Sequence, residues 1–258
     1  LTEDLDLSYR VQLEGYRIRF DFDCECPAEL PNNVVALKSQ QRRWAKGSME
    51  TALKLIPRIF RSPRLSFGQK AEAFVHLTHY FVAVLMLAVC VLTLPVLLWI
   101  PMPKIGWLVG VLWTIVGLSA MAPCFMYTVS GYVLRRAMFS FCHFPAMLVT
   151  GTGLCLNNAA AVFEAIRGHR SEFIRTPKSG STNAVRKGGK YRATSSLAAC
   201  LLEIAIGVYC LYALDVYLHS RKFLFGFFIA AYGAGMLTFG LLTLKSCLQA
   251  PRRAVAGG

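Results

Sequence analysis

Four long apolar runs stand out in the pattern of hydrophobic and polar positions, and short polar or proline-containing stretches separate them within each pair. About 20 apolar residues in helical conformation cross the hydrocarbon core of a bilayer, so each run is long enough for a tilted transmembrane helix. The pattern therefore predicts two helical hairpins, with spans at residues 73–100, 105–134, 195–218 and 223–244.

A fifth apolar run covers residues 137–156, but a histidine, a proline and two glycines interrupt it. The distribution of basic residues bears on its placement, because 25 of the 28 lysines and arginines lie in residues 1–70, 135–192 and 245–258. All of them share one side of the membrane only if this run does not cross, as the positive-inside rule favours. We expect residues 135–168 to form an interfacial or re-entrant helix; a fifth span is the alternative.

The first 70 residues are more polar and contain the run SQQRRWAKG at residues 39–47. A helix here places Gln40, Arg43 and Trp44 on one face, at i, i+3 and i+4. An amide, a planar cation and an indole together suit a sugar and a diphosphate. A basic amphipathic helix lying on lipid, with Trp44 as its interfacial anchor, is the competing interpretation.

A second polar motif, Thr2-Glu3-Asp4, comes just before apolar positions with helical spacing. Taken alone, Thr2 or Asp4 at this place is typical of a helix N-cap. A strand-like segment follows at residues 16–20, and then a loop, CPAELP, at residues 26–31.

The ordered series T-E-D, strand, proline-containing loop and Q-x-x-R-W resembles the C-terminal half of the membrane-embedded family 2 glycosyltransferases, the cellulose synthase-like group. The run at residues 39–47 is especially similar to bacterial relatives of the plant mannan and glucan synthases. This resemblance implies a fold in which an α-helical membrane protein, with about four transmembrane helices plus interfacial helices, is joined to the C-terminal part of an α/β GT-A domain.

The resemblance assigns roles to the T-E-D motif. It implies that Asp4 is the general base that deprotonates the acceptor hydroxyl, with Glu3 beside it at the acceptor site and Thr2 completing the motif. Asp6 is the competing carboxylate, and we prefer Asp4 because the last residue of T-E-D takes the proton in this family.

The same resemblance places Trp44 beneath the acceptor sugar, Arg43 on the diphosphate and Gln40 at the same acceptor and diphosphate site. For Arg42 and Lys46 we expect solvated or lipid-facing positions instead.

A third match lies between the second and third predicted spans. The spacing of Phe173, Thr176 and Lys178 is similar to that of the gating loop of processive synthases, F-x-V-T-x-K, which swings over the active site. Arg175 replaces the usual valine. A basic loop attracted to anionic lipid is the alternative.

The chain begins on Leu1 and enters a motif at once, so we expect it to lack an N-terminal half that carries nucleotide-binding elements. The family implies a divalent cation, Mg or Mn, held by a D-x-D motif there. Asp21-Phe22-Asp23 has that spacing but follows T-E-D, so we expect no metal site in this sequence. Expected partners are a nucleotide sugar of the UDP-glucose or GDP-mannose type, a growing glycan and the lipid bilayer.

Composition supports membrane insertion, because 55% of the residues are apolar and the mean hydropathy is +0.46. The net charge of +14 does not indicate nucleic-acid binding, because the basic residues adjoin the spans rather than form a separate domain. The nine cysteines are scattered without a C-x-x-C pair. This spacing disfavours zinc and disulfide frameworks and favours buried apolar thiols.

Glu203 is a carboxylate inside the third predicted span, near mid-depth. An unpaired charge there is costly, so Glu203 should face the bundle interior or be protonated. Contact with a translocating glycan and a hydrogen bond to a neighbouring helix are both open.

The sequence thus predicts an inverting, processive glycosyltransferase that elongates a β-linked glucan, mannan or glucomannan and passes it across the plasma (inner) membrane, with its catalytic side cytoplasmic. A non-processive enzyme acting on a lipid is the nearest alternative, and a transporter or scaffold a more distant one. The expected order is a GT-A remnant, interfacial helices with Q-x-x-R-W, a hairpin, the interfacial or re-entrant helix, the gating-type loop, a second hairpin and a tail, at residues 1–31, 32–70, 73–134, 135–168, 169–192, 195–244 and 245–258.

Overall fold

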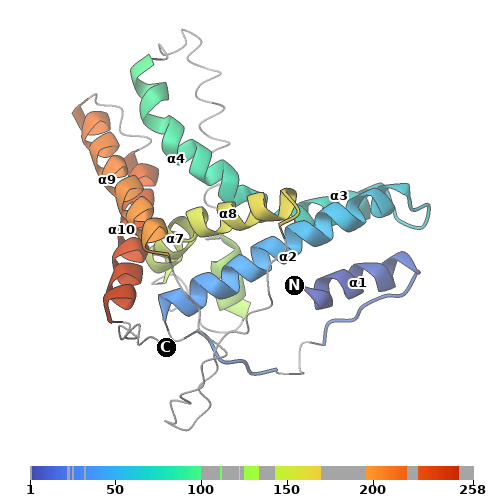
Figure 1. Ribbon diagram of the computed structural model, residues 1–258. Helices are drawn as coiled ribbons and strands as arrows, with labels where there is room; N and C mark the ends of the chain where they lie inside the picture. The colour runs from blue at the N-terminus through green and yellow to red at the C-terminus, as the bar shows by residue number, and fades with distance from the viewer. Residues whose placement is uncertain are drawn as a thin grey trace. The chain divides into compact units, whose positions relative to one another are not determined.

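The computed structural model describes residues 2–21, 24, 26–31, 33–99, 111, 122, 125–133, 143–169, 196–219 and 226–249. The named helices within these ranges are α1 (Glu3–Leu13), α2 (Val34–Arg61), α3 (Phe67–Thr78), α4 (Phe81–Trp99), α7 (Phe144–Gly153), α8 (Cys155–Ile166), α9 (Leu197–His219) and α10 (Gly226–Gln249) (Figure 1). The helical part of the predicted fold class is confirmed.

The chain divides into two compact units. The first contains Leu1–Ala88, Leu154–Ala205 and Phe239–Gly258, and the second contains Val89–Gly153 and Ile206–Thr238. Helices α4, α9 and α10 each contribute to both units.

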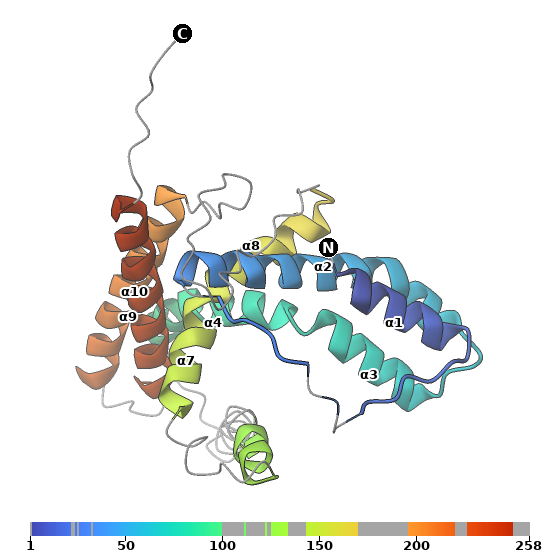
Figure 2. The same ribbon diagram turned by 90° about the horizontal axis from the view of Figure 1, so that it is seen from below.

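Helix α2 is the central element of the first unit, and α1, α3 and α8 lie along it (Figures 1 and 2). It begins at Asn33, whose side chain accepts a hydrogen bond from the Ala36 amide at 2.8 Å. Helix α3 begins with a capping box, because the side chains of Ser66 and Gln69 each accept the other's backbone N–H. Apolar residues of all four helices form the core: Leu13, Met49, Ala52, Leu55, Ile59, Ala73, Leu77, Val162 and Ala165.

Helix α1 runs parallel to the C-terminal half of α2. Thr2 contacts Thr51, and Asp6 contacts Lys54. Further along both segments, Arg64 just beyond α2 donates to the Leu13 carbonyl at 3.2 Å. The N-terminus of α1 therefore points toward the half of α2 that carries the Q-x-x-R-W motif.

In the second unit, α9 and α10 approach closely at glycines. A Cβ added to Gly207 would lie 2.6 Å from the Leu237 side chain, so this contact requires glycine. One turn further along α9, the sulfur atoms of Cys210 and of Cys90 in α4 lie 3.3 Å apart, and both thiols are buried. Cys155 and Cys200 in the first unit are also buried. The prediction of buried apolar thiols is thus confirmed for Cys90, Cys200 and Cys210, whereas Cys24 and Cys26 are exposed and Cys124 lies outside the described residues.

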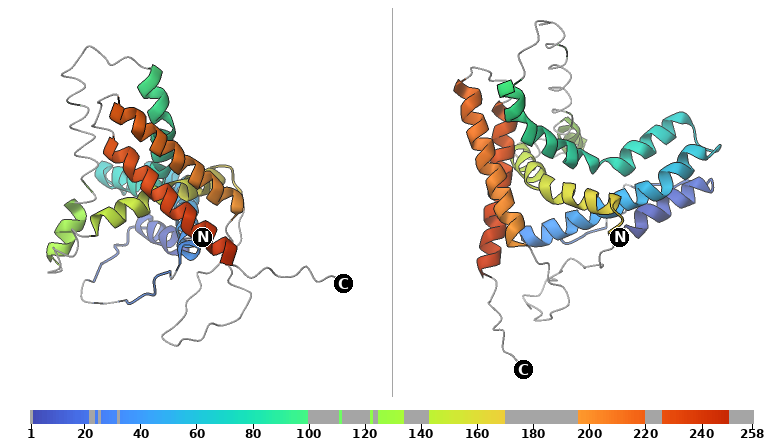
Figure 3. Two further views of the ribbon diagram at one scale, coloured as in Figure 1. Left: turned by 90° about the vertical axis from the view of Figure 1, so that its left-hand side faces the viewer. Right: turned by 45° about the horizontal axis from the view of Figure 1, so that its top comes forward.

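Within the described ranges, α9 and α10 are long and apolar enough to cross a membrane, and up to four spans result if the pairs α3–α4 and α7–α8 each count as one. Helices α9 and α10 cover the predicted third and fourth spans (Figure 3). The predicted second span, residues 105–134, lies mostly outside the described residues. Whether residues 135–168 cross the membrane stays a prediction.

The first predicted span differs from the structure at its start. Residues 73–78 belong to α3 and the apolar helix α4 begins only at Phe81. The reason is that Ala73 and Leu77 are buried in the core of the first unit, and the polar residues Thr78 and His79 follow before α4 begins.

The α/β character is not found, because no β-strand is present in the part of the chain that the structure describes. Residues 16–20, expected to be strand-like, form no strand, and Tyr16, Ile18 and Phe20 are all exposed. A strand needs a neighbour to accept and donate its backbone hydrogen bonds, and none of the described segments lies in that position.

Candidate functional site

One face of α2 carries both the predicted acceptor residues and the contact with α1. At 3.6 residues per turn, Gln40, Trp44 and Thr51 lie within about 40° of one another around the helix. The Trp44 side chain is 41% exposed, so its indole ring is accessible to a ligand. The prediction that residues 40–44 are helical is thus confirmed, and the helix continues for four more turns beyond them.

The start of α1 docks on this face. The hydroxyl oxygens of Thr2 and Thr51 lie 3.3 Å apart, and Thr51 follows Trp44 by seven residues, or about 10 Å along the helix axis. Thr2 occupies the N-cap position of α1, but its side chain makes no capping hydrogen bond there. The capping role is therefore wrong for Thr2, whose hydroxyl contacts α2 instead.

Glu3 and Asp4 lie in the exposed first turn of α1. One carboxylate oxygen of Asp4 accepts the Leu5 backbone N–H at 2.9 Å, and both acidic residues favour the N-terminal end of the helix dipole. The T-E-D motif and the exposed Trp44 thus share one side of α2.

Asp6, the competing carboxylate, is engaged in ion pairs. Its two oxygens lie 2.8 Å from Lys54 Nζ and 2.8 Å from Arg10 Nε. The hydrogen bond from Lys54, assisted by the charge of Arg10 and opposed by partial desolvation, lowers the pKa of Asp6 below its ordinary value of 3.8. A carboxylate held ionised by two cations joins α1 to α2 and is a poor proton acceptor.

The opposite side of α2 carries three cations that the protein itself neutralises. Lys38 pairs with Glu203, Arg42 pairs with Glu164, and Lys46 donates to the His169 carbonyl. Lys46 is only 2% exposed. The expectation that Lys46 faces solvent or lipid is therefore wrong, because α8 and the turn after it supply acceptors on this side of the helix, whereas Arg42 is paired but still partly exposed.

Arg43 lies about 60° around α2 from Gln40 and about 100° from each of its neighbours, Arg42 and Trp44. It borders the face of Gln40 and Trp44, whereas Arg42 points to α8. The diphosphate role of Arg43 stays a prediction.

Helix α8 ends beside the middle of α2. Gly168 has a positive φ of 68°, and the amide of His169 donates back to the Glu164 carbonyl at 3.0 Å. This turn directs the His169 carbonyl to Lys46. The predicted gating-loop residues Phe173, Thr176 and Lys178 lie outside the described residues.

Sequence reasoning missed the partner of Glu203. The carboxylate is 2% exposed and pairs with Lys38 of α2, so it faces the protein interior, as one alternative predicted. It lies six residues into α9, about 9 Å along the axis from the start of this helix. A lysine in an amphipathic basic helix gives no local signal that it will be buried.

A divalent cation has no site among the described residues, where no three His, Cys, Asp or Glu side chains converge. The described residues therefore do not fit a metal. Ligands in a D-x-D motif upstream stay a prediction.

Comparison with sequence families and with curated proteins separately supports the resemblance to family 2 glycosyltransferases. The profile described as Glycosyl transferase family group 2 matches residues 1–154. A protein of Oryza sativa subsp. japonica, "Probable glucomannan 4-beta-mannosyltransferase 11", is 28% identical over 195 residues, which are 72% of this chain and 31% of that protein.

Two proteins of Arabidopsis thaliana match a shorter segment. "Glucomannan 4-beta-mannosyltransferase 7" is 36% identical over 69 residues, which are 27% of this chain and 12% of that protein. "Glucomannan 4-beta-mannosyltransferase 2" is 32% identical over 69 residues, which are 27% of this chain and 13% of that protein. The chain thus spans less than a third of the length of these relatives. No solved structure matches it significantly.

The ion pairs of Asp6 predict a pH dependence for the docking of α1. Because the pKa of Asp6 is lowered in the folded protein, its contribution is fully present above the ordinary pKa of 3.8 and is lost as the pH falls through the lowered value. Hydrogen exchange of the α1 amides, corrected for intrinsic rates, should show protection decreasing below pH 3.8. An Asp6→Asn variant should lack this component. Parallel loss of protection in both proteins would contradict the assignment.

Proposed function

The chain belongs to the Glycosyl transferase family group 2, and we propose that it forms the acceptor side and the membrane part of an inverting glycosyltransferase. The observation that carries the proposal is the shared face of α2, where the start of α1 docks at Thr51, about 10 Å along the axis from Trp44. A base at the first turn of α1 and an aromatic platform on α2 then border one site.

The proposed reaction joins an acceptor hydroxyl to the anomeric carbon of a nucleotide sugar. Asp4 takes the hydroxyl proton as the new C–O bond forms, and the bond from the anomeric carbon to the diphosphate breaks on the opposite side. The charge of the leaving diphosphate is stabilised by Arg43. Trp44 supports the apolar face of the acceptor ring, and Gln40 holds its hydroxyl groups.

We further propose that the product is a β-linked polysaccharide of the mannan, glucan or glucomannan type. Support comes from the relatives, whose names describe glucomannan mannosyltransferases, and from the apolar helices α9 and α10, which are suited to membrane passage. The proposed donor is GDP-mannose or UDP-glucose. We also propose that the enzyme extrudes the polysaccharide processively through the plasma membrane. In this proposal the catalytic side is cytoplasmic, and residues 169–192 form a gating loop.

The nature of the product separates this proposal from transfer to a lipid. Full-length enzyme in membranes, given radiolabelled GDP-mannose or UDP-glucose, should yield label in a high-molecular-weight product that a matching β-glycanase degrades. Label extracted into organic solvent as a glycolipid would decide for the lipid acceptor. Absence of transfer from either donor would count against both.

Asp4→Asn in the full-length enzyme should lower kcat by about a hundred- to ten-thousand-fold, because general base catalysis contributes that much. Donor KM should change little. Asp6→Asn is the matched control, since Asp6 is already paired with Lys54 and Arg10, and its loss should be much smaller. If Asp6→Asn has the larger effect, the base is assigned to the wrong carboxylate.

The two neighbouring arginines give a second matched pair. Arg43→Met should raise the KM for the nucleotide sugar or the inhibition constant of its free nucleoside diphosphate by about tenfold or more, because a charged hydrogen bond to phosphate is lost. Arg43→Lys should lie in between, since lysine cannot make the bidentate contact. Arg42→Met removes the pair with Glu164 and should leave nucleotide affinity unchanged. Equal effects of both Met variants would refute the assignment.

A further inference from the structure

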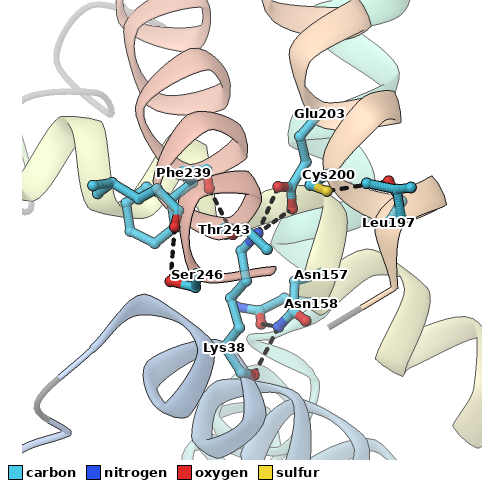
Figure 4. A network of polar contacts seen from close by, with 10 residues as sticks. Lys38, Asn157, Asn158, Leu197, Cys200, Glu203, Phe239, Thr243 and Ser246 are labelled. Carbon is cyan, nitrogen blue, oxygen red and sulfur yellow. Dashed lines mark hydrogen bonds and ion pairs between the residues drawn. The ribbon is translucent and has the colours of Figure 1, made fainter. Parts of the chain in front are cut away.

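The ammonium group of Lys38 is buried at the junction of α2 with the first turns of α9 and the last turns of α10 (Figure 4). Its nitrogen lies 2.7 Å and 2.5 Å from the two carboxylate oxygens of Glu203 and 2.7 Å from the hydroxyl of Thr243. An ammonium has three protons to donate, so these three contacts satisfy it completely. Lys38 and Glu203 are 7% and 2% exposed, respectively.

The network extends beyond the ion pair. The Thr243 hydroxyl donates to the Phe239 carbonyl within α10 at 2.6 Å, which leaves its lone pair for Lys38. On the other side, the side chain of Asn157 in α8 donates to the backbone carbonyl of Lys38 at 3.1 Å. One residue of α2 is therefore bonded to α8, α9 and α10 at once.

Stability alone does not explain a buried ion pair. Removing two charges from water costs several kcal/mol, and well-packed apolar residues in their place are often as stable or more so. What the pair adds is direction, because only one register of α2 against α9 and α10 brings Lys38 to both Glu203 and Thr243. Helices α9 and α10 pack closely against each other here, since a Cβ on Gly240 would lie 2.8 Å from the Ile204 side chain.

The same helix carries the proposed acceptor residues. Gln40 and Trp44 follow Lys38 by two and six residues in the uninterrupted helix α2, so Trp44 lies about 9 Å along the axis from the buried ammonium. If the N-terminal half of α2 shifted against α9 and α10, the Trp44 indole would move by about the same distance as the helix.

We infer that Lys38, Glu203 and Thr243 are positioning residues that fix the acceptor platform of α2 relative to the first turns of α9 and the last turns of α10. The positioning role rests on the proposed function, but its structural part is independent of it. This inference gives a role to Glu203, which is the only buried carboxylate of α9 among the described residues.

Hydrogen exchange tests the structural part without any sugar. The double variant Lys38→Met/Glu203→Gln removes both charges together, because either single change would leave an unpaired buried charge. In the full-length protein, amides of residues 37–44 should exchange at least about tenfold faster than in the wild type, which corresponds to about 1.4 kcal/mol. Residues 49–59, held by the core with α3 and α8, should stay protected. Unchanged exchange at residues 37–44 would overturn the inference.

Activity tests the positioning role. With radiolabelled GDP-mannose and a β-linked manno-oligosaccharide acceptor, the double variant should lose about tenfold or more in kcat/KM for the acceptor, since an error of 1 Å in placement can cost more than this. The KM for GDP-mannose should change little. Arg58→Met, an exposed cation of the same helix, is the control and should behave as the wild type.

Thr243 gives a second test that does not depend on the folding of the double variant. Thr243→Val removes the acceptor for Lys38 at constant volume and should shift acceptor kcat/KM in the same direction, whereas Thr243→Ser keeps the hydroxyl and should restore it. Equal behaviour of Val and Ser would overturn the inference. If wild-type enzyme transfers no mannose, the proposed function fails, and the exchange of residues 37–44 still decides the structural part.

Discussion

The helical periodicity of α2 determines which elements of the first unit pack on each of its sides. Helix α2 is 28 residues long and uninterrupted, so 3.6 residues per turn assign each member of the basic run SQQRRWAKG to one side. One side receives α1, another α3, and the side of Lys38, Arg42 and Lys46 receives α8 with the ends of α9 and α10. A shift of one residue would turn this helix by about 100° and take its apolar core positions away from their partners.

Local sequence was sufficient to find what lies within one element. The helix around Gln40 to Trp44 and the helices α9 and α10 follow from periodicity and apolar length, and all are present. The start of α4 was missed because residues 73–78 are apolar enough to extend a span, yet the core of the first unit takes Ala73 and Leu77. Competition between lipid and protein for the same apolar residue is decided by tertiary packing, which no window of sequence contains.

The site was predictable in composition but not in geometry. T-E-D and Q-x-x-R-W are separated by more than 35 residues, and only the tertiary contacts of Thr2 with Thr51 and of Asp6 with Lys54 show that they share one side of α2. Lys38 was invisible for the same reason, because its acceptors lie 165 and 205 residues away along the chain. The strand expected at residues 16–20 is absent for a related reason: a favourable local pattern forms no strand without a neighbouring strand for its backbone hydrogen bonds.

The net charge of +14 overstates the cations that α2 can offer to an anionic ligand or to lipid. Lys38, Arg42 and Lys46 are bound by acceptors on α8, α9 and α10, and Lys54 by Asp6 of α1. Each such pair exchanges attraction to a mobile anion for a fixed contact between two elements. Most of these basic residues of α2 therefore form ion pairs or hydrogen bonds that hold elements of the protein together. Selectivity for a diphosphate then depends on which side of the helix an arginine occupies rather than on the number of positive charges.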